Sequence, residues 1–227
     1  MGKQVVVVGL GRFGLGVATT LHNLDHDVLA IDRNAEAVQE AASLATHAVQ
    51  VEDFNEAALK KVGISNFDIG IVAMGSDMGN SIITTLLLKR LGVRYVIARA
   101  ENNKHGEILE MIGADRVVYP EREMGERIGH EATLGDITGY VSAAPGHIIA
   151  KIQAKPNFVG MSLSELGISR LGRFGISVLL IQRRKEAIIT PQQDQIIEAE
   201  DVLFVYGNED KLREFMAKAI SNGKTRL

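Results

Sequence analysis

The clearest chemical signal in this chain is the glycine-rich segment Gly9-Leu10-Gly11-Arg12-Phe13-Gly14. It has the spacing G-x-G-x-x-G, follows a short β-branched run and opens a helical pattern, which is the context in which this motif binds nucleotides. Gly9 permits the tight turn, Gly11 lets a phosphate approach the backbone, and Gly14 lets the helix pack close to the strand. The helix N-terminus adds free N–H donors and the positive end of a dipole. The segment therefore predicts a dinucleotide or mononucleotide site; the alternative is the same fold with an empty site.

An acidic residue completes this pattern. Asp32 ends the next apolar run, Val28-Leu29-Ala30-Ile31, and lies 18 residues after Gly14. A carboxylate there can accept hydrogen bonds from both ribose hydroxyls and would repel a 2′-phosphate, which argues against NADP. Arg33 beside it weakens that inference and is counted among the candidate nucleotide-binding residues.

Further candidates follow the later strands, because ligands bind at the carboxyl ends of the strands in such sheets. Glu52 and Asp53 could meet an adenine amino group, or could equally cap a helix. Arg99 could contact a phosphate or form a surface ion pair. Arg12 could remain solvated, although its place inside the glycine loop favours a phosphate contact. The run Ala73-Met74-Gly75 could line the adenine or the ribose.

These residues need a sheet to bring them together, and the chain before Pro120 alternates between apolar strand patterns and helical patterns. The spacing predicts strands at 4–8, 28–32, 47–51, 69–73, 95–99 and 116–119, with helices at 12–24, 35–42, 55–62, 79–91 and 104–112. This repeated βα alternation is typical of a Rossmann-like, doubly wound parallel sheet of the α/β class.

After Pro120 the pattern changes to a small α+β domain. A helix is expected at 121–132, followed by a polar, glycine-bearing stretch at 133–146. We place the boundary near 140, which gives a nucleotide-binding domain with its crossover helix at 1–140 and a C-terminal domain at 141–227. Further elements are expected as an extended segment at 147–155, strands at 176–182, 187–190 and 202–206, and helices at 163–166 and 209–219, with a frayed end at 222–227.

Composition excludes several classes of protein. Lys and Arg total 25 against 28 Asp and Glu, for a net charge of −3, whereas a nucleic-acid binder should carry a basic excess. There is no Cys, so disulfides and thiolate metal sites are excluded. No apolar run is long enough to span a bilayer, and the N-terminus lacks a secretory pattern. The expected location is therefore cytoplasmic.

The chain also lacks an evident catalytic constellation. A dehydrogenase needs an acid or base positioned against the nicotinamide, whereas the six His residues are scattered and form no metal-ligand spacing. We expect no enzyme activity and no catalytic residues. The alternatives are a small NAD-dependent oxidoreductase, or a NAD or nucleotide sensor for another membrane transporter.

Several segments taken together resemble the RCK (KTN) family, whose members regulate Ktr- and Trk-type potassium uptake. They are Gly9–Gly14, Val28–Asp32, Val72–Gly75, Thr84–Lys89, Ile112–Glu121, Phe158–Leu166, Ile188–Pro191 and Asp201–Gly207. The resemblance implies homodimers that assemble into an octameric ring, peripheral at the inner face of the membrane, beneath a KtrB- or TrkH-like subunit that conducts K⁺. It implies ATP and ADP as competing ligands that switch the ring, with NAD or NADH as further ligands.

The resemblance also implies roles for particular residues. Arg12 would reach the γ-phosphate of the nucleotide in a neighbouring subunit, and Glu121 would join a divalent cation (Mg²⁺ or Ca²⁺) at the dimer interface. Cyclic di-AMP would bind between two C-terminal domains, in a cleft to which Ile168, Ile176 and Pro191 could contribute; these three could equally be core or plain dimer contacts.

Two segments depart from the family pattern. Glu200, in Ala199-Glu200-Asp201, stands where many relatives have Gly, which affects a turn. Val51-Glu52-Asp53 replaces the common Gly-Asp-Ala, so the adenine contacts there are open.

Overall fold

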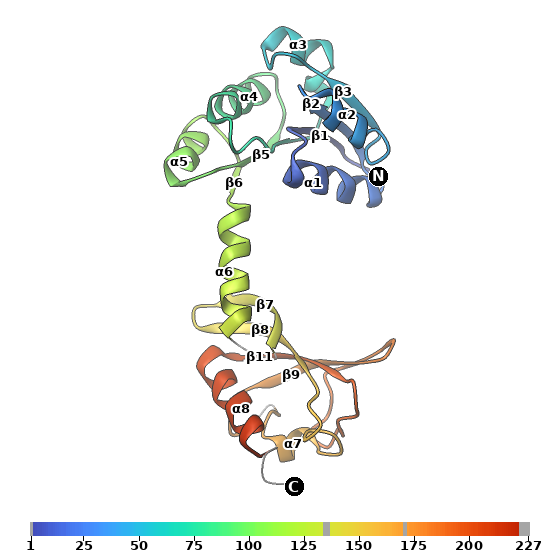
Figure 1. The fold of residues 1–227 in the computed structure, drawn as a ribbon, viewed down its shortest axis with the longest axis vertical. Helices are drawn as coiled ribbons and strands as arrows, with labels where there is room; N and C mark the ends of the chain where they lie inside the picture. Colours follow the sequence, from blue (N-terminus) through green and yellow to red (C-terminus); the bar gives the residue numbers. More distant parts are fainter. Residues whose placement is uncertain (1, 134–136, 170–171, 223–227) are drawn as a thin grey trace. The chain divides into compact units, whose positions relative to one another are not determined.

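The computed structural model describes residues 2–133, 137–169 and 172–222. The chain folds into two compact units, Met1–Arg122 and Glu123–Leu227. Each unit has its own sheet (Figure 1). Each also has its own hydrophobic core.

Six parallel strands form the sheet of the first unit, in the spatial order β3-β2-β1-β4-β5-β6. They are β1 (Gln4–Val8), β2 (Asp27–Asp32), β3 (His47–Gln50), β4 (Ile69–Val72), β5 (Tyr95–Arg99) and β6 (Arg116–Val118). Val5–Val8 of the central strand β1 are fully buried, because helices cover both faces of the sheet. The Rossmann-like, doubly wound parallel sheet predicted from the sequence is confirmed.

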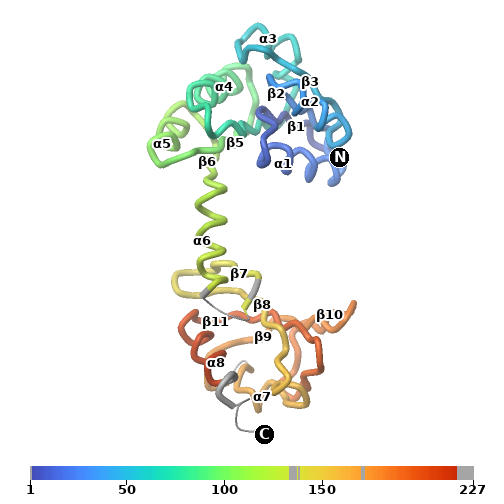
Figure 2. The backbone as a smooth tube through the Cα atoms, in the orientation of Figure 1, coloured from blue at the N-terminus to red at the C-terminus, as the bar shows by residue number. Residues whose placement is uncertain are grey.

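The helices of the first unit divide between the two faces of its sheet. The helices α1 (Arg12–Asn23) and α2 (Ala35–Ala41) pack on one face with Val5, Val7 and Ala30. The other face carries α3 (Glu56–Lys61), the 3₁₀ turn η1 (Ile64–Asn66), α4 (Met78–Arg90) and α5 (Asn103–Met111). Figure 2 traces how the chain alternates between strand and helix through this unit.

The second unit is built on a five-stranded antiparallel sheet in the order β10-β9-β11-β8-β7. The helix α6 (Pro120–Thr133) crosses the division between the units. It is followed by β7 (Ile137–Ala144), β8 (His147–Gln153), α7 (Leu163–Leu166), β9 (Ser177–Arg183), β10 (Glu186–Ile189), β11 (Val202–Asn208) and α8 (Glu209–Asn222). Phe215 of α8 stacks on Phe158 and meets Phe174 edge-on, which fixes the helix over the core. No described helix of either unit is long and apolar enough to cross a membrane.

The strand β7 corrects the sequence analysis, which expected a polar connection at 133–146. Ile137 is fully buried in the second core, and β7 pairs with β8 across a turn made by Pro145 and Gly146. Gly139 and Gly146 adopt positive φ, at an irregularity in the pairing and at the turn. Because glycines are typical of loops, their presence at 139 and 146 obscured the strand in the sequence. The boundary expected near 140 falls within β7, and the two units divide instead between Arg122 and Glu123. The expected fraying at 222–227 lies, except for Asn222, outside the described residues.

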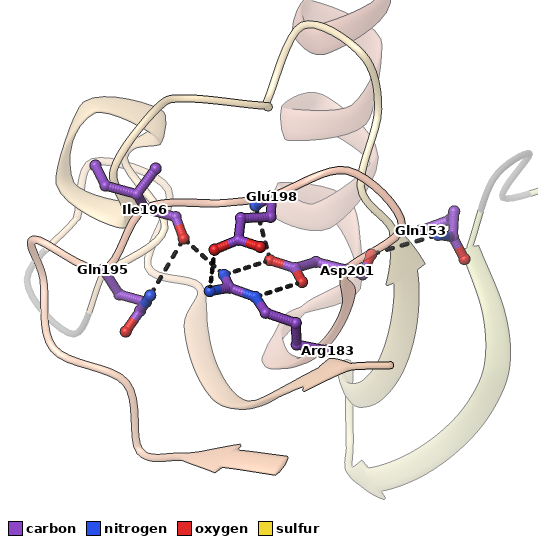
Figure 3. A network of polar contacts seen from close by, with 6 residues as sticks. All are labelled: Gln153, Arg183, Gln195, Ile196, Glu198 and Asp201. Carbon is purple, nitrogen blue, oxygen red and sulfur yellow. Dashed lines mark hydrogen bonds and ion pairs between the residues drawn. The ribbon is translucent and has the colours of Figure 1, made fainter. Parts of the chain in front are cut away.

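A buried ion pair fastens the start of β11 to the end of β9 (Figure 3). Asp201 is fully buried, and its two carboxylate oxygens accept hydrogen bonds from Nε and Nη2 of Arg183 at 2.9 and 2.8 Å. The backbone N–H of Glu198 donates to the same carboxylate at 2.8 Å, and the Glu198 side chain accepts from Arg183 at 2.6 Å. Every charge in this network therefore has a partner within the unit.

Candidate nucleotide-binding site

The glycine loop between β1 and α1 is closely packed on its inner side. Gly9 adopts a φ of 95°, and a Cβ there would lie 2.7 Å from the Met74 side chain. A Cβ on Gly14 would lie 1.8 Å from the carbonyl oxygen of Gly9. Both glycines are therefore required by the turn and by the close approach of the helix, as the sequence predicted.

The outer side of the loop is open at Gly11. A Cβ at Gly11 would meet nothing within 4 Å. Gly11 also begins α1 without a side-chain cap, whereas Asn34, Asn55, Asp77 and Asn102 cap α2, α3, α4 and α5 through their side chains. The first N–H groups of α1 therefore lack the side-chain acceptor that those four helices have, which is the arrangement that binds an anion.

Asp32 lies beside this loop at the end of β2. Its Oδ2 accepts a hydrogen bond from the N–H of Leu10 at 2.6 Å, and its Oδ1 accepts one from the N–H of Asn34 at 2.8 Å. A carboxylate has about four lone-pair positions, so two remain for the hydroxyls of a ribose. The strand register puts the carboxyl ends of β1 and β2 side by side, with Val8 opposite Ile31.

Arg33 is held by the loop that opens α4. Its Nη2 lies 3.3 Å from Oδ2 of Asp77, and its guanidinium lies over the ring of Phe54 at 5.4 Å. Hydrogen bonds from the side chain and the backbone of Asn80 keep the pKa of Asp77 below its usual value, so this carboxylate stays charged. Asp77 and Asn80 were not among the residues predicted from the sequence. An Asp at the start of a helical pattern, three residues before Asn80, does indicate a helix cap.

The candidates after β3 and β4 differ in their surroundings. Glu52 and Asp53 are exposed and follow β3, while the capping residue of α3 is Asn55 rather than either of them. Ala73 and Gly75 are buried behind the glycine loop, and Met74 contacts Gly9. The structure thus brings Ala73, Met74 and Gly75 to the glycine loop. The adenine contact of Glu52 and Asp53 stays a prediction.

The other two arginine candidates, Arg12 and Arg99, differ in their contacts. Arg12 is exposed and makes no hydrogen bond or ion pair to any residue that the structure describes, and Phe13 beside it is half-buried. Arg99 pairs with Glu121 of α6 at 2.5 Å. Because Arg12 is free, its guanidinium can contact an anion without breaking an existing bond, whereas Arg99 has to exchange one.

The expected cation and second-ligand residues lie elsewhere. Within the described ranges, no group of three or more His, Cys, Asp or Glu side chains could hold a metal ion, and Glu121 is engaged by Arg99. Ile168 and Ile176 are fully buried in the core of the second unit, so a ligand in this conformation could not touch their side chains. Pro191 is partly exposed.

Two of the cavities on the first unit lie away from the glycine loop. One of about 340 Å³ lies near the amino ends of β2 and β3 and is lined by Asp27, Leu29, His47, Ala48, Val49, Val62 and Phe67. The other, of about 230 Å³, lies where β5 and β6 end and includes Glu121. The candidate phosphate site is the outer side of the loop at Gly11, where a Cβ would meet nothing within 4 Å.

Comparison with known proteins agrees with this architecture. The TrkA-N domain model matches residues 5–120 and the TrkA-C domain model matches residues 147–219. Ktr system potassium uptake protein C of Bacillus subtilis is 36% identical over 97% of this chain and 99% of its own length. Ktr system potassium uptake protein A of the same organism is 35% identical over 94% of this chain and 95% of its own.

This chain belongs to the Ktr potassium uptake protein family.

Solved structures place the Ktr fold among RCK domains. The GsuK RCK domain superposes with a TM-score of 0.64 over 93% of this chain and 46% of that chain, at 20% identity. The GsuK channel bound to NAD gives a TM-score of 0.63 over 93% of this chain and 38% of that chain, at the same identity. The TrkA-N domain of the Escherichia coli inner membrane protein ybaL superposes with a TM-score of 0.52 over 58% of this chain and 97% of that chain, at 20% identity.

Proposed function

We propose that this chain is the nucleotide-binding gating subunit of a Ktr/Trk-type potassium transporter, in which the exchange of ATP and ADP switches the state of the assembly. The observation that carries the proposal is the glycine loop, where an uncapped helix start and an open Gly11 lie beside the carboxylate of Asp32. The family relationship supplies the transport context.

The loop favours an adenine nucleotide with a free ribose. The N–H groups at the start of α1 suit phosphate oxygens, and the two remaining lone pairs of Asp32 suit the 2′- and 3′-hydroxyls. A ribose 2′-phosphate would meet the charge of Asp32, which disfavours NADP. NAD and NADH fit the same features, and a protein with this fold has been solved with NAD bound.

A nucleotide can gate the assembly only if it contacts its two states differently. Arg12 offers such a difference, because its guanidinium is exposed and unengaged among the described residues and so can reach an anion beyond its own loop. In the proposed dimer it contacts the γ-phosphate of the neighbouring subunit's nucleotide, which ADP lacks. Hydrolysis is not needed for this switch.

The wider assembly follows from the same proposal. The dimers form an octameric ring that docks in the cytoplasm against a K⁺-conducting membrane subunit of the KtrB or TrkH type. Glu121 contributes to a Mg²⁺ or Ca²⁺ site where two subunits meet, because a carboxylate supplies such cations with both an oxygen ligand and charge. A cyclic di-AMP site in the second unit stays a prediction.

Calorimetric titration of the purified chain and of Arg12→Ala with ATP, ADP, NAD and NADH tests the proposal. A charge-assisted hydrogen bond contributes about 1.5–3 kcal/mol, so Arg12→Ala should weaken ATP by about tenfold or more while ADP affinity barely changes. Arg12→Ala should also abolish the ATP response of K⁺ flux in reconstituted transporter. Equal losses for ATP and ADP would contradict the trans γ-phosphate contact, and absence of binding to the wild-type chain would contradict the nucleotide site itself.

A separate assay addresses the oxidoreductase alternative. The purified chain is incubated with NADH and a panel of oxidised substrates, and absorbance of the reduced nicotinamide is followed. The proposal expects binding without turnover; substrate-dependent oxidation of NADH would favour the enzyme.

A further inference from the structure

A continuous line of contacts leads from the glycine loop to the first turn of α6. Gly9 packs against Met74, and a Cβ on the next residue, Gly75, would lie 2.6 Å from the guanidinium carbon of Arg99. Nη2 of that same guanidinium pairs with Oε1 of Glu121. Glu121 belongs to the helix whose later residues form part of the second unit.

The absence of a side chain at Gly75 is what admits Arg99 to this position. Gly75 is buried, and a methyl group there would overlap Cζ, Nε and Nη2 of the guanidinium. The loop that carries Met74 and Gly75 therefore sets where the guanidinium lies. A shift of this loop would therefore change the space that the guanidinium occupies.

Arg99 is incompletely satisfied where it lies. Its side chain is 22% exposed, and its Nε is buried with no hydrogen-bond partner among the described residues. Its partner Glu121 is 67% exposed and remains well hydrated. A buried unpaired donor is unfavourable, and a half-exposed ion pair is weak, so an anion that satisfies more of the guanidinium can displace Glu121.

We propose that Arg99 is a positioning residue that exchanges Glu121 for a phosphate group of the bound nucleotide, so that nucleotide binding releases the carboxylate at the start of α6. The inference rests on the nucleotide site proposed above and describes how that site is regulated. Glu121 holds only Nη2, and a phosphate bound through the unpaired Nε together with Nη2 would draw the guanidinium away from Oε1, so the two contacts compete.

The competition has a consequence for Glu121. In the nucleotide-free chain Arg99 neutralises this carboxylate and occupies one of its oxygens. Once Arg99 has moved to the phosphate, Glu121 regains both oxygens and its full charge, which a cation requires.

A double-mutant cycle with ADP, in the presence of a divalent-cation chelator, tests the exchange. ADP is the probe because it lacks a γ-phosphate, so the proposed Arg12 contact does not affect its binding. The chelator removes divalent cations that could bind Glu121. The variants are Arg99→Gln, Glu121→Gln and both together, with Glu126→Gln as the control for loss of an exposed carboxylate on the same helix. Thermal melts confirm that each variant is folded.

Removing the competitor should raise affinity. Glu121→Gln is expected to bind ADP about two- to fivefold more tightly than wild type, the range expected for an ion pair with an exposed partner. Arg99→Gln should bind more weakly, and Glu121→Gln should add no gain in that background. If Glu121→Gln acted only by removing a negative charge near the nucleotide, ADP affinity would rise equally with and without Arg99. If it damaged the structure, ADP affinity would not rise.

The outcomes separate this inference from the function on which it rests. A wild-type chain that binds no ADP would refute the nucleotide site. A wild-type chain that binds ADP, with Glu121→Gln unchanged, weaker, or equally improved in both backgrounds, would overturn the exchange alone. If Arg99→Gln binds too weakly to titrate, Arg99→Lys replaces it; Lys lacks the planar fork, so the gain from Glu121→Gln should be smaller there than in wild type.

Discussion

The glycine-loop edge of the first unit and the Arg183 network of the second unit both gather charged side chains, but only the second satisfies them fully. Asp201 has two oxygens filled by Arg183 and a third bond from the Glu198 N–H, all within one unit. At the glycine loop, Gly11 faces open space, α1 begins without a side-chain cap, and Arg12 has no described partner.

We take this difference to distinguish a structural cluster of charges from the proposed binding site. A buried charge that is fully paired inside the chain holds the fold and leaves nothing for a ligand. Exposed donors and cations without a protein partner at the carboxyl ends of parallel strands are hydrated in the free chain and can exchange that water for an anion. Substitutions in the second region should therefore change stability, and those in the first should change binding.

The largest effect is expected from Asp201→Ala. The substitution leaves Arg183 at the edge of the core without its bidentate partner, and breaking a buried pair costs about 3–5 kcal/mol of unfolding free energy. Chemical denaturation measures the loss, and calorimetry with ADP should show unchanged affinity in the folded fraction. A loss below about 1 kcal/mol would place this ion pair with ordinary surface pairs.

The same pair should make stability depend on acid pH. Burial alone would raise the pKa of Asp201, but the hydrogen bonds from Arg183 and the Glu198 N–H outweigh it and lower the pKa below its usual value. A lowered folded-state pKa means that the contribution is fully present above about pH 4 and is lost as the pH falls through the folded value. The stability difference between wild type and Asp201→Asn should thus be constant from pH 7 to about pH 4 and shrink below it. A difference that grows on acidification would contradict the assigned direction.

Asp32→Ala should show the opposite pattern, with binding affected more than folding. We expect adenine-nucleotide affinity to fall by about 1–3 kcal/mol, the scale of hydrogen bonds to a charged group. Asp27→Ala, an exposed carboxylate at the opposite end of the same strand, is the matched comparison. Titration with ATP decides the matter: an Asp32 variant within twofold of wild type would remove its ribose role.

The smallest effect concerns the turn before β11. Glu200 has a φ of 67°, a conformation that glycine adopts without strain and other residues adopt at a cost. Glu200→Gly should raise the unfolding free energy by about 0.5–1 kcal/mol, while Ala199→Gly, at a neighbour without positive φ, should lower it. Denaturant midpoints of the two variants would test this, and a destabilised Glu200→Gly would show that the strain is absent.

Much of the first unit could be predicted because its strands are buried on both faces. Such strands appear in the sequence as unbroken apolar runs like Val5–Val8, and the glycine motif marks where the first one ends. The ends of β7 and the domain boundary were harder to predict from the sequence. That strand mixes buried Ile137 with exposed Val141 and contains Gly139, so its composition resembles a connection.

The pairing of Arg99 with Glu121 could not be read from spacing. The two residues are 22 positions apart, and they meet because β5 and β6 pair in parallel with Arg99 opposite Val118, which brings both carboxyl ends to one edge. The sequence predicted that Arg99 either contacts a phosphate or forms a surface ion pair. In the structure without nucleotide, Arg99 forms an ion pair with Glu121. Which helix starts lack a cap likewise depends on side-chain geometry that only the fold supplies.

Titration of Gly11→Val with ATP tests the central claim, that the open side of the glycine loop is a phosphate site, most directly. A side chain at Gly11 meets nothing in the free chain, so this variant should fold with an unfolding free energy within about 1 kcal/mol of wild type. Gly16→Ala, whose Cβ also meets nothing within 4 Å but lies one turn further along α1, is the matched control. We predict that Gly11→Val loses ATP binding while Gly16→Ala retains it; a folded Gly11→Val that binds ATP as tightly as wild type would contradict the claim.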